Sequence, residues 1–308
     1  MRRGLWRGLT LLALLVLTAC AAESTTNPPA ASPTAGGPGE HKLTVTVGGT
    51  ERTFLLHVPA SYDPARAVPA VVALHHRPGS GTAMRELTGF DAKADAEGFL
   101  VAYPEGVGGQ FNAFGCCGAQ DDVGFVKAVA GQLVERWHAD PDRVFLAGVS
   151  NGGDLSFRAA VEAPGVFAAI GAVSGGFAGG RTEAADYRPT APVSVVTLIG
   201  AADPQATTFR TGVDTWRSRL ACPAPPAPTT QPTTAAQPTT APPGPALDPG
   251  VHRTTTHCPD GSDVDAYVVD GGAHAWFGAA AGELKDTAAK IKATDVLWAF
   301  FAAHPRRR

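Results

Sequence analysis

Charge is scarce in this chain of 308 residues, of which 17% are charged and whose formal net charge is −3. Basic residues are no more frequent than acidic ones, and Arg2, Arg3 and Arg7 lie at the extreme N-terminus. Losing these three with a leader would leave −3 − 3, or about −6. Proteins hold nucleic-acid phosphates with a surplus of lysine and arginine. The composition therefore argues against nucleic acid as a partner.

The apolar run near the N-terminus, residues 9–17, is too short to span a bilayer. It lies between arginines and small residues, which is the pattern of a secretion signal. Leu17-Thr18-Ala19-Cys20 resembles the lipobox of bacterial lipoproteins. The resemblance implies a signal peptide over residues 1–19 and a lipid on Cys20 that attaches an exported protein to a membrane surface. The alternative is an ordinary cleaved leader followed by secretion, with Cys20 incidental.

The chain lacks a Cys-x-x-Cys pair and any His/Cys cluster with zinc spacing, so we expect no metal site. Beyond Cys20 an even number of cysteines remains in a chain predicted to reach an oxidising compartment, which favours disulfides. Three connectivities are possible for Cys116, Cys117, Cys222 and Cys258. Cys116 and Cys117 are adjacent and could pair with each other only in a strained turn, or one could be a free thiol.

Two segments contain too few apolar residues to join a core. Residues 20–40 are rich in Pro, Ala, Ser, Thr and Gly, and we expect a flexible tether. Residues 223–250 hold ten prolines and repeat Gln-Pro-Thr-Thr, so they cannot form a sheet and are expected to be disordered. This tract could separate two domains, but a disulfide between the flanking Cys222 and Cys258 would make it a surface loop. We therefore expect one catalytic domain over residues 41–304, interrupted by this loop.

Between these segments, short β-branched runs alternate with helical patterns, which predicts the α/β class with a mostly parallel central sheet flanked by helices. The first two strands, joined by Gly48-Gly49, should form an N-terminal antiparallel hairpin. Helices are expected over 123–138 after the capping residues Asp121 and Asp122, over 155–162, and after Thr294. The expected strands are 42–47, 52–58, 70–74, 100–103, 144–147, 168–173, 193–198 and 264–269.

A nucleophile elbow is predicted at Gly148-Val149-Ser150-Asn151-Gly152, which matches G-x-S-x-G between an expected strand and an expected helix. A serine in such a turn projects its hydroxyl, and the flanking glycines leave room for neighbouring backbone. The N–H groups that open the helix face a developing oxyanion. Ser150 is thus the candidate nucleophile of an α/β-hydrolase fold, and a loop serine is the alternative.

A serine needs a base and an orienting acid, which follow it along the chain in this fold. Asp203 comes after the expected strand 193–198, and His274 lies in a glycine-rich loop after the strand 264–269. Asp265 and Asp270 are the spare acids. The alternative bases are His252 and His257, which have no clear strand before them, whereas His304 near the C-terminal arginines is expected to be solvated.

The oxyanion donors are predicted to be the backbone of Asn151 and a second N–H from the loop after residues 70–74. Because Pro78 has no N–H, that donor must come from His76 or Arg77. The neighbouring His75 and His76 do not indicate a metal site, since adjacent residues cannot easily face one ion without a third ligand.

Together these motifs resemble the secreted polyhydroxybutyrate depolymerase-like esterases, relatives of the feruloyl and acetylxylan esterases of carbohydrate esterase family one. The resemblance spans roughly residues 43–303 apart from the Pro/Thr tract. It implies hydrolysis of carboxylic esters, without a cofactor, on Ser150, Asp203 and His274. It rests on Leu74-His75, Tyr103-Pro104, Cys116-Cys117-Gly118, Asp121-Asp122-Val123-Gly124-Phe125, Asp140-Pro141-Asp142-Arg143-Val144, Ser150-Asn151-Gly152-Gly153, Asp203-Pro204 and Gly272-Ala273-His274-Ala275-Trp276.

Departures from the family's pattern concern the substrate more than the triad. His76 replaces a glycine, Ile199 a histidine, Asp154 an apolar residue and Phe277 a proline. We expect His75, Asp154 and Trp276 to line the substrate pocket, with Trp276 a platform for an acyl chain or aromatic ring. For Asp154 the alternative is a favourable charge in the first helical turn, and for Trp276 it is core packing.

The leading hypothesis is an exported serine ester hydrolase that acts through an acyl-enzyme on a polyester, an acylated polysaccharide or a small lipid ester. One alternative keeps the triad but passes the acyl group to an envelope glycan or lipid alcohol. The other is a non-catalytic surface-binding lipoprotein that retains the hydrolase scaffold.

Overall fold

The expected sheet is present in the computed structural model, which describes residues 36–114, 116–228 and 250–307. Its six inner strands are built from apolar runs and are largely buried, because helices cover both faces. The inner strands are β3 (Val68–Leu74), β4 (Leu100–Pro104), β5 (Ala139–Val149), β6 (Ala169–Val173), β7 (Ser194–Gly200) and β9 (Asp263–Val269). The outer strands are β1 (Gly39–Val47), β2 (Thr50–Val58) and β8 (Val251–His257).

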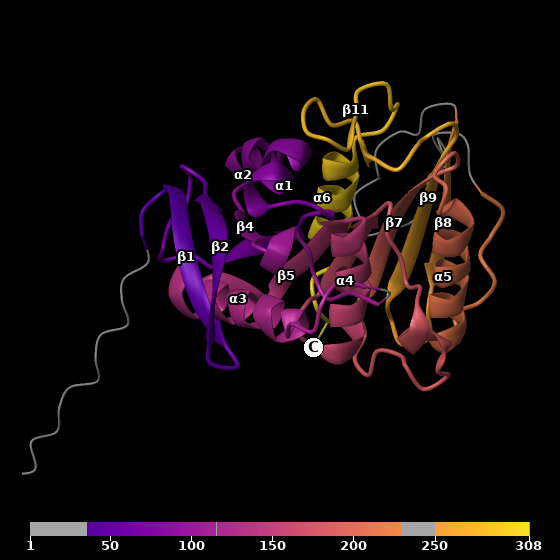
Figure 1. The fold of residues 1–308 in the computed structure, drawn as a ribbon, viewed down its shortest axis with the longest axis horizontal. Helices are drawn as coiled ribbons and strands as arrows, with labels where there is room; N and C mark the ends of the chain where they lie inside the picture. The colour runs from indigo at the N-terminus through magenta and orange to yellow at the C-terminus, as the bar shows by residue number, and fades with distance from the viewer. Residues whose placement is uncertain (1–35, 115, 229–249, 308) are drawn as a thin grey trace, which may run out of the picture. The chain divides into compact units, whose positions relative to one another are not determined.

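The strand order is β1-β2-β4-β3-β5-β6-β7-β9-β8. Figure 1 labels β1, β2, β4, β5, β7, β9 and β8 in this order across the sheet. Strands β4, β3, β5, β6, β7 and β9 run parallel, whereas β1, β2 and β8 pair antiparallel with their neighbours. The carboxyl ends of the parallel strands therefore share one edge of the sheet, where open α/β sheets bind ligands. A separate pair, β10 (Trp276–Phe277) and β11 (Lys285–Asp286), lies in the loop before the last helix.

Side chains alternate between two apolar layers, as in β3, where Val72 joins one core cluster and Val71 the other. One layer packs on α3 (Asp122–Trp137), α4 (Asn151–Glu162) and α5 (Ala206–Arg219). The other packs on α1 (Gly81–Thr88), α2 (Phe90–Glu97) and α6 (Ala293–Ala303). Two short 3-10 turns, η1 (Val107–Gly109) and η2 (Gly180–Glu183), lie in connecting loops. These layers form an α/β-hydrolase fold.

The predicted fold class is confirmed, and so is the hairpin, in which Val47 pairs with Thr50 across Gly48-Gly49. All eight expected strands and the three expected helices are present with shifted ends. Strand β8 and helices α1, α2 and α5 are additional; β8 has a polar sequence and forms because it pairs with β9. At the start of α3, Asp121 accepts a hydrogen bond from Gly124 N–H, whereas Asp122 does not cap. The Asp122 carboxylate pairs instead with the buried side chain of Arg52 at 2.7 Å.

The structure joins Cys222 to Cys258 and Cys116 to Cys117. The predicted signal peptide over residues 1–19, lipidated Cys20 and nearly all of the tether and of the tract 223–250 lie outside the described residues. The described residues belong to one compact unit, Thr34–Arg308. Within them, no helix combines the length and apolarity that crossing a membrane requires.

Candidate active site

Four loops meet at the carboxyl edge of the parallel strands, and each carries a residue selected from the sequence. The segment from His75 to Arg77 follows β3, Ser150 follows β5, Asp203 follows β7, and His274 follows β9. The order β3-β5-β6-β7-β9 makes β3 and β9 the outer members of this group, with β5, β6 and β7 between them. The sheet thereby gathers residues that are as far apart in the chain as His75 and His274.

The backbone at Ser150 has the strained geometry of a sharp strand-to-helix turn. Its φ of 54° and ψ of −122° are unfavourable for a residue with a side chain. A side chain on Gly148 would collide with the backbone of Gly152, and one on Gly152 would lie 2.7 Å from His75 O. The Ser150 N–H donates to Val173 O at 3.0 Å, which fixes the turn against β6. Half-buried Ser150 is therefore the N-cap of α4, at the carboxyl edge of the sheet.

Asp203 and His274 form a hydrogen-bonded pair. The His274 Nδ1–H donates to Asp203 Oδ2 at 2.8 Å, which leaves Nε2 as the basic nitrogen. The other carboxylate oxygen, Oδ1, accepts from Gln205 N–H at 2.8 Å. The side chain of Asp203 is 0% exposed and that of His274 is 28% exposed. An inaccessible carboxylate thus orients a partly accessible imidazole.

The two loops that carry this pair are also joined through their backbones. Ala201 N–H donates to Val269 O and Ala202 N–H to Gly272 O, each at 2.8 Å. A side chain on Gly200 would clash with the backbone of residues 272 and 273. Among the described residues, no hydrogen bond links the Ser150 hydroxyl to the His274 ring. Catalytic hydrogen bonds are often loose before substrate binds, so this geometry is compatible with a triad.

The alternative acids and bases have other partners. Asp265 pairs with Arg253 at 2.5 Å, and Asp270 with His252 at 2.9 Å. His257 lies on the edge strand β8 and pairs with Asp263. His304, expected to be solvated, is instead stacked on Phe300 and bonded to Asp263 Oδ2 at 2.9 Å, because the chain after α6 returns to the start of β9.

The predicted oxyanion donors lie in the loop after β3 and at the start of α4. The backbone N–H groups of Asn151, His76 and Arg77 have no hydrogen-bond acceptor among the described residues. The close approach of Gly152 to His75 O brings the start of α4 against the loop after β3. The side chain of His76 is buried and its Nε2 lies 3.4 Å from Glu283 Oε2, whereas Arg77 is exposed. Backbone N–H groups from two neighbouring loops thus remain without an acceptor among the described residues.

His75 supports this loop from inside. Its ring is fully buried, its Nδ1–H donates to His76 O at 2.7 Å, and its Nε2 accepts from Gly106 N–H at 3.0 Å. Burial lowers the pKa of His75 to about 4, so the ring is neutral at pH 7. Because both nitrogens bind backbone, the expectation that His75 lines the substrate pocket does not fit the structure. The ring shapes the loop from below.

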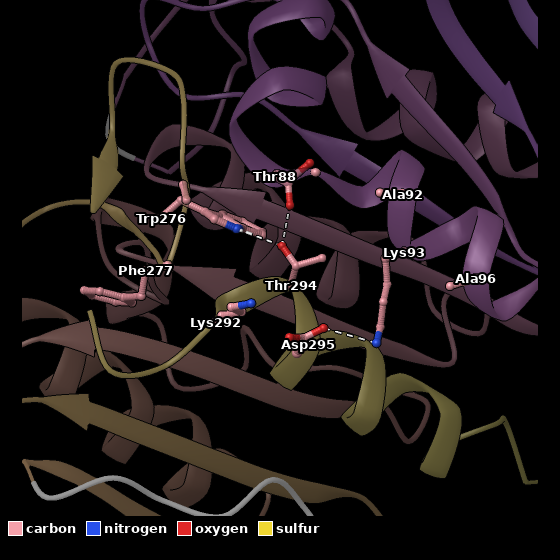
Figure 2. A pocket seen from close by; sticks show the side chains of 12 residues that line it. Thr88, Ala92, Lys93, Ala96, Trp276, Phe277, Lys292, Thr294 and Asp295 are labelled. Atoms are coloured by element: carbon pink, nitrogen blue, oxygen red, sulfur yellow. Dashed lines mark hydrogen bonds and ion pairs between the residues drawn. The ribbon is translucent and has the colours of Figure 1, made fainter. Parts of the chain in front are cut away.

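Trp276 is likewise a core residue. It is 1% exposed, meets Phe90 edge to face, and donates from Nε1 to Thr294 Oγ1 at 3.0 Å. It borders a hollow of about 290 Å³ between α2 and the start of α6, where Lys93 pairs with Asp295 (Figure 2). The residues that line this hollow do not include Ser150, Asp203 or His274. The alternative stated for Trp276, core packing, therefore describes it better than a substrate platform.

Asp154 lies in the first turn of α4. Its Oδ1 accepts from Gly176 N–H at 2.8 Å, and no basic side chain pairs with it in the part of the chain that the structure describes. Burial raises the pKa of the Asp154 carboxyl to about 7, although the hydrogen bond from Gly176 opposes the shift. An unpaired carboxyl beside the nucleophile is thus held against the loop after β6.

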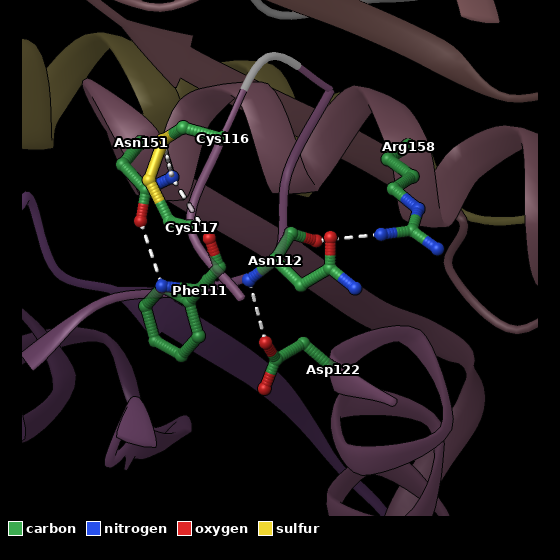
Figure 3. The surroundings of a disulfide bond; sticks show 7 residues. All are labelled: Phe111, Asn112, Cys116, Cys117, Asp122, Asn151 and Arg158. Carbon is green, nitrogen blue, oxygen red and sulfur yellow. Dashed lines mark hydrogen bonds between the residues drawn. A yellow bond between two sulfur atoms is a disulfide. The ribbon is translucent and has the colours of Figure 1, made fainter. Parts of the chain in front are cut away.

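The disulfide between the neighbouring residues Cys116 and Cys117 lies beside Asn151, the residue that follows Ser150, as Figure 3 shows. The Asn151 side chain clamps Phe111 twice, accepting from its N–H at 2.8 Å and donating to its carbonyl at 3.0 Å. Asn151 Nδ2 also lies 3.9 Å from Cys116 Sγ. These contacts hold Phe111 and Cys116 against the start of α4, with Cys116 exposed.

Three groups that can bind a metal lie together away from this edge. Among the described residues, ligand atoms of Glu40, His57 and Asp91 lie within 4.8 Å of one another. Arg85 pairs with both carboxylates, and Asp95 lies 3.0 Å from His57 Nε2. Burial alone would lower the pKa of His57, but the hydrogen bonds to Glu40 and Asp95 raise it. Because Arg85 on α1 pairs with both carboxylates, this cluster is an ion-pair network that joins β1, β2, α1 and α2.

Ser174 is a further polar residue at this edge, and its place there was not predicted from the sequence. This residue follows β6 directly, is fully buried, and bonds through its hydroxyl to the backbone of Ala275. The sequence contains a signal that could have predicted this position. Ser174 and Gly175-Gly176 follow a buried strand, so they must lie at the same edge of the sheet as the other loops.

Proteins similar to this chain in sequence include several that are named esterases. A protein of Nocardia uniformis subsp. tsuyamanensis named "Putative esterase NocK" is 34% identical over 221 residues, which cover 64% of this chain and 63% of that protein. Feruloyl esterase C of Emericella nidulans is 28% identical over 160 residues, covering 50% and 55%. The chain thus spans less than two thirds of the length of these curated relatives.

Solved structures share the fold. An acetyl xylan esterase from Aspergillus awamori superposes with a TM-score of 0.60 at 16% identity, covering 85% of this chain and 99% of that one. Residues 53–206, half of the sequence, match the family described as "Esterase PHB depolymerase". This segment runs from β2 to the start of α5 and contains Ser150 and Asp203. The chain therefore belongs to the family of PHB depolymerase esterases.

Proposed function

We propose that this protein is a carboxylic ester hydrolase that acts through an acyl-enzyme on Ser150. The single observation that carries the proposal is the Asp203–His274 pair at the edge where Ser150 begins α4. The family and the relatives named feruloyl esterase and acetylxylan esterase support an ester substrate. The substrate class is a polyester, a feruloylated or acetylated polysaccharide, or a small ester.

Acylation begins when His274 Nε2 takes the proton of the Ser150 hydroxyl as the oxygen attacks the ester carbonyl. The carboxylate of Asp203 holds Nδ1–H and stabilises the imidazolium that forms. The proton then passes to the leaving alcohol, which departs as the acyl-enzyme forms. Water, deprotonated by His274, attacks the acyl-enzyme and releases the carboxylic acid.

The oxyanion is stabilised by backbone donors from two loops. Asn151 N–H at the start of α4 is one, and an N–H of His76 or Arg77 is the other. The positive end of α4 adds to this field. Losing one such donor typically costs about 2.7 to 4 kcal/mol of barrier. The side-chain clamp of Asn151 on Phe111 keeps the first donor in place.

The test is Ser150→Ala, assayed with p-nitrophenyl acetate and with a fluorophosphonate that labels activated serines. Because no nucleophile remains, we expect hydrolysis to fall by about 10⁴-fold or more and labelling to disappear, at an unchanged unfolding temperature. Ser262→Ala, a buried serine at the amino end of β9, is the matched control and should retain both. Retained turnover in Ser150→Ala would exclude this nucleophile.

We further propose that the protein is exported and lipid-anchored through Cys20. The support is the sequence pattern of residues 1–20 and the two disulfides, which form in oxidising compartments.

A further inference from the structure

The segment after β6 connects the nucleophile turn with the loop that carries the base. Ser174 begins this segment with a φ of 46°, an unusual value for a residue other than glycine. Its hydroxyl donates to Ala275 O at 3.1 Å and accepts from Ala275 N–H at 3.1 Å. Because Ala275 follows His274, one buried hydroxyl holds both backbone groups next to the base.

The other end of the segment is held by Asp154. Gly176 N–H donates to Asp154 Oδ1 at 2.8 Å, and Asp154 N–H donates to Ser150 O at 3.0 Å. A side chain on Gly175 would lie 2.6 Å from Ser150 O, so the segment packs directly on the nucleophile turn. No other hydrogen-bond donor to the Asp154 carboxylate is found among residues that the structure describes.

These contacts form a series from the nucleophile to the base. Ser150 at the N-cap of α4 bonds to Asp154 in the first turn of α4. The series continues through Gly176 and Ser174 in the segment after β6 to Ala275, which follows His274. The Asp203 pair orients the imidazole ring, but it does not connect the base loop to α4. The series supplies that connection. Phe209, on α5, packs between Gly176 and the ring of His274, with ring centroids 6.3 Å apart.

We propose that Asp154 and Ser174 are positioning residues that tie the nucleophile turn to the base loop and so fix the position of His274 relative to Ser150. This proposal rests on the proposed function of that pair. Its physical basis is the steep dependence of proton transfer on geometry, since a displacement of about 1 Å can lower a rate by about 100-fold. Asp154 acts here as a hydrogen-bond acceptor, and Ser174 as both donor and acceptor.

The test compares variants that remove the tie with one that keeps it. Asp154→Leu and Ser174→Ala should each lower kcat for p-nitrophenyl acetate by about 10- to 100-fold, with KM within about twofold. Asp154→Asn retains an oxygen that accepts from Gly176 N–H, so it should keep kcat within about threefold. Ser262→Ala is the control for loss of a buried hydroxyl elsewhere and should match wild type.

A double-mutant cycle tests whether the two residues act in series. Breaking either link releases the base loop, so Asp154→Leu/Ser174→Ala should be no slower than the worse single variant within about threefold. Losses that multiply would overturn the proposal, as would an Asp154→Asn variant as impaired as Asp154→Leu. A loss in Ser174→Ala that is explained by unfolded protein, measured by circular dichroism, would also overturn it. If Asp154→Leu does not fold, Ser174→Ala and Asp154→Asn still decide.

Amide hydrogen exchange separates this proposal from the proposed function. The Ala275 amide should exchange about 10-fold faster in Asp154→Leu and in Ser174→Ala than in wild type. Its exchange rate should be unchanged in Ser262→Ala. Faster exchange in a protein that hydrolyses no ester would refute the proposed function and leave the tie in place. An active protein whose Ala275 exchange and kcat do not respond to Asp154→Leu or Ser174→Ala would refute the tie.

Discussion

At the scale of single residues, the buried carboxylate of Asp203 has a hydrogen-bond partner for each of its two oxygens. One oxygen accepts from His274 and the other from the backbone of Gln205, so the imidazole has one orientation and one tautomer. The spare acid Asp270 is exposed and pairs with half-buried His252 on β8. The difference lies in burial and in the strand that each acid follows.

We predict that Asp203→Asn lowers kcat by about 10³- to 10⁴-fold, because an amide favours the wrong tautomer of His274. The kinetic constants for p-nitrophenyl acetate are the measurement, and Asp270→Asn is the matched control, with activity near wild type. Equal losses in both variants would contradict the assignment of Asp203.

Asp154 gives a second prediction, about stability and pH. Its carboxyl has a pKa of about 7 in the folded chain, against an ordinary value of 3.8, because burial disfavours the charged form. The stability from this group is therefore full below about pH 4 and is lost as the pH rises through 7. Asparagine does not ionise.

Asp154→Asn should consequently exceed wild type in unfolding free energy at pH 9, by on the order of 1 to 4 kcal/mol. The advantage should largely vanish at pH 4.5, where the wild-type carboxyl is mostly protonated in the folded chain. Urea unfolding at the two pH values measures both quantities. A variant no more stable than wild type at pH 9 would show that the carboxylate is better solvated than its burial indicates.

At the scale of elements, the disulfide Cys222–Cys258 joins the chain after α5 to the chain after β8, with 36 positions between its cysteines. By the chain-entropy model, the bridge contributes roughly 3 to 4 kcal/mol by restricting the unfolded chain. Both cysteines lie at the amino edge of the parallel strands, because β9 begins just beyond Cys258. The site lies at the opposite edge.

We therefore predict that Cys222→Ser/Cys258→Ser loses about 3 kcal/mol of unfolding free energy in urea while its kcat stays near wild type. A loss in kcat without a loss in stability would mean that the bridge supports the site directly. Cys116→Ser/Cys117→Ser is the contrasting variant, since that disulfide contacts Asn151 beside the nucleophile.

At the scale of the whole molecule, the sequence pattern predicts where the protein resides. A lipid on Cys20 would hold the catalytic unit at a membrane surface by burying acyl chains, each methylene contributing about 0.8 kcal/mol. We expect a fatty-acid label to be incorporated into the full-length protein and lost in Cys20→Ala, which should appear in the soluble fraction. A wild-type protein without label would point to an ordinary cleaved leader.

Much of the architecture was predictable, because the inner strands are apolar runs bounded by turn residues and the helices near Ser150 carry clear periodicity. Strand β8 was not, since Val251–His257 is polar on its own and becomes a strand only by pairing with β9. Helices α1, α2 and α5 are short of apolar residues and depend on the sheet that they cover. The local sequence of a segment does not predict which distant segments it will pair with or pack against.

The sequence by itself determined the candidate residues for ester hydrolysis: Ser150 in its glycine-flanked turn, Asp203, His274, and a loop in which proline limits the backbone donors. Only the tertiary structure decided that Asp203 and not Asp265 or Asp270 meets His274, and that His75 and Trp276 turn inward. It also revealed Ser174, whose partner lies 101 positions away. The reason is physical, because strand order decides which loops meet and burial decides which polar groups must find partners there.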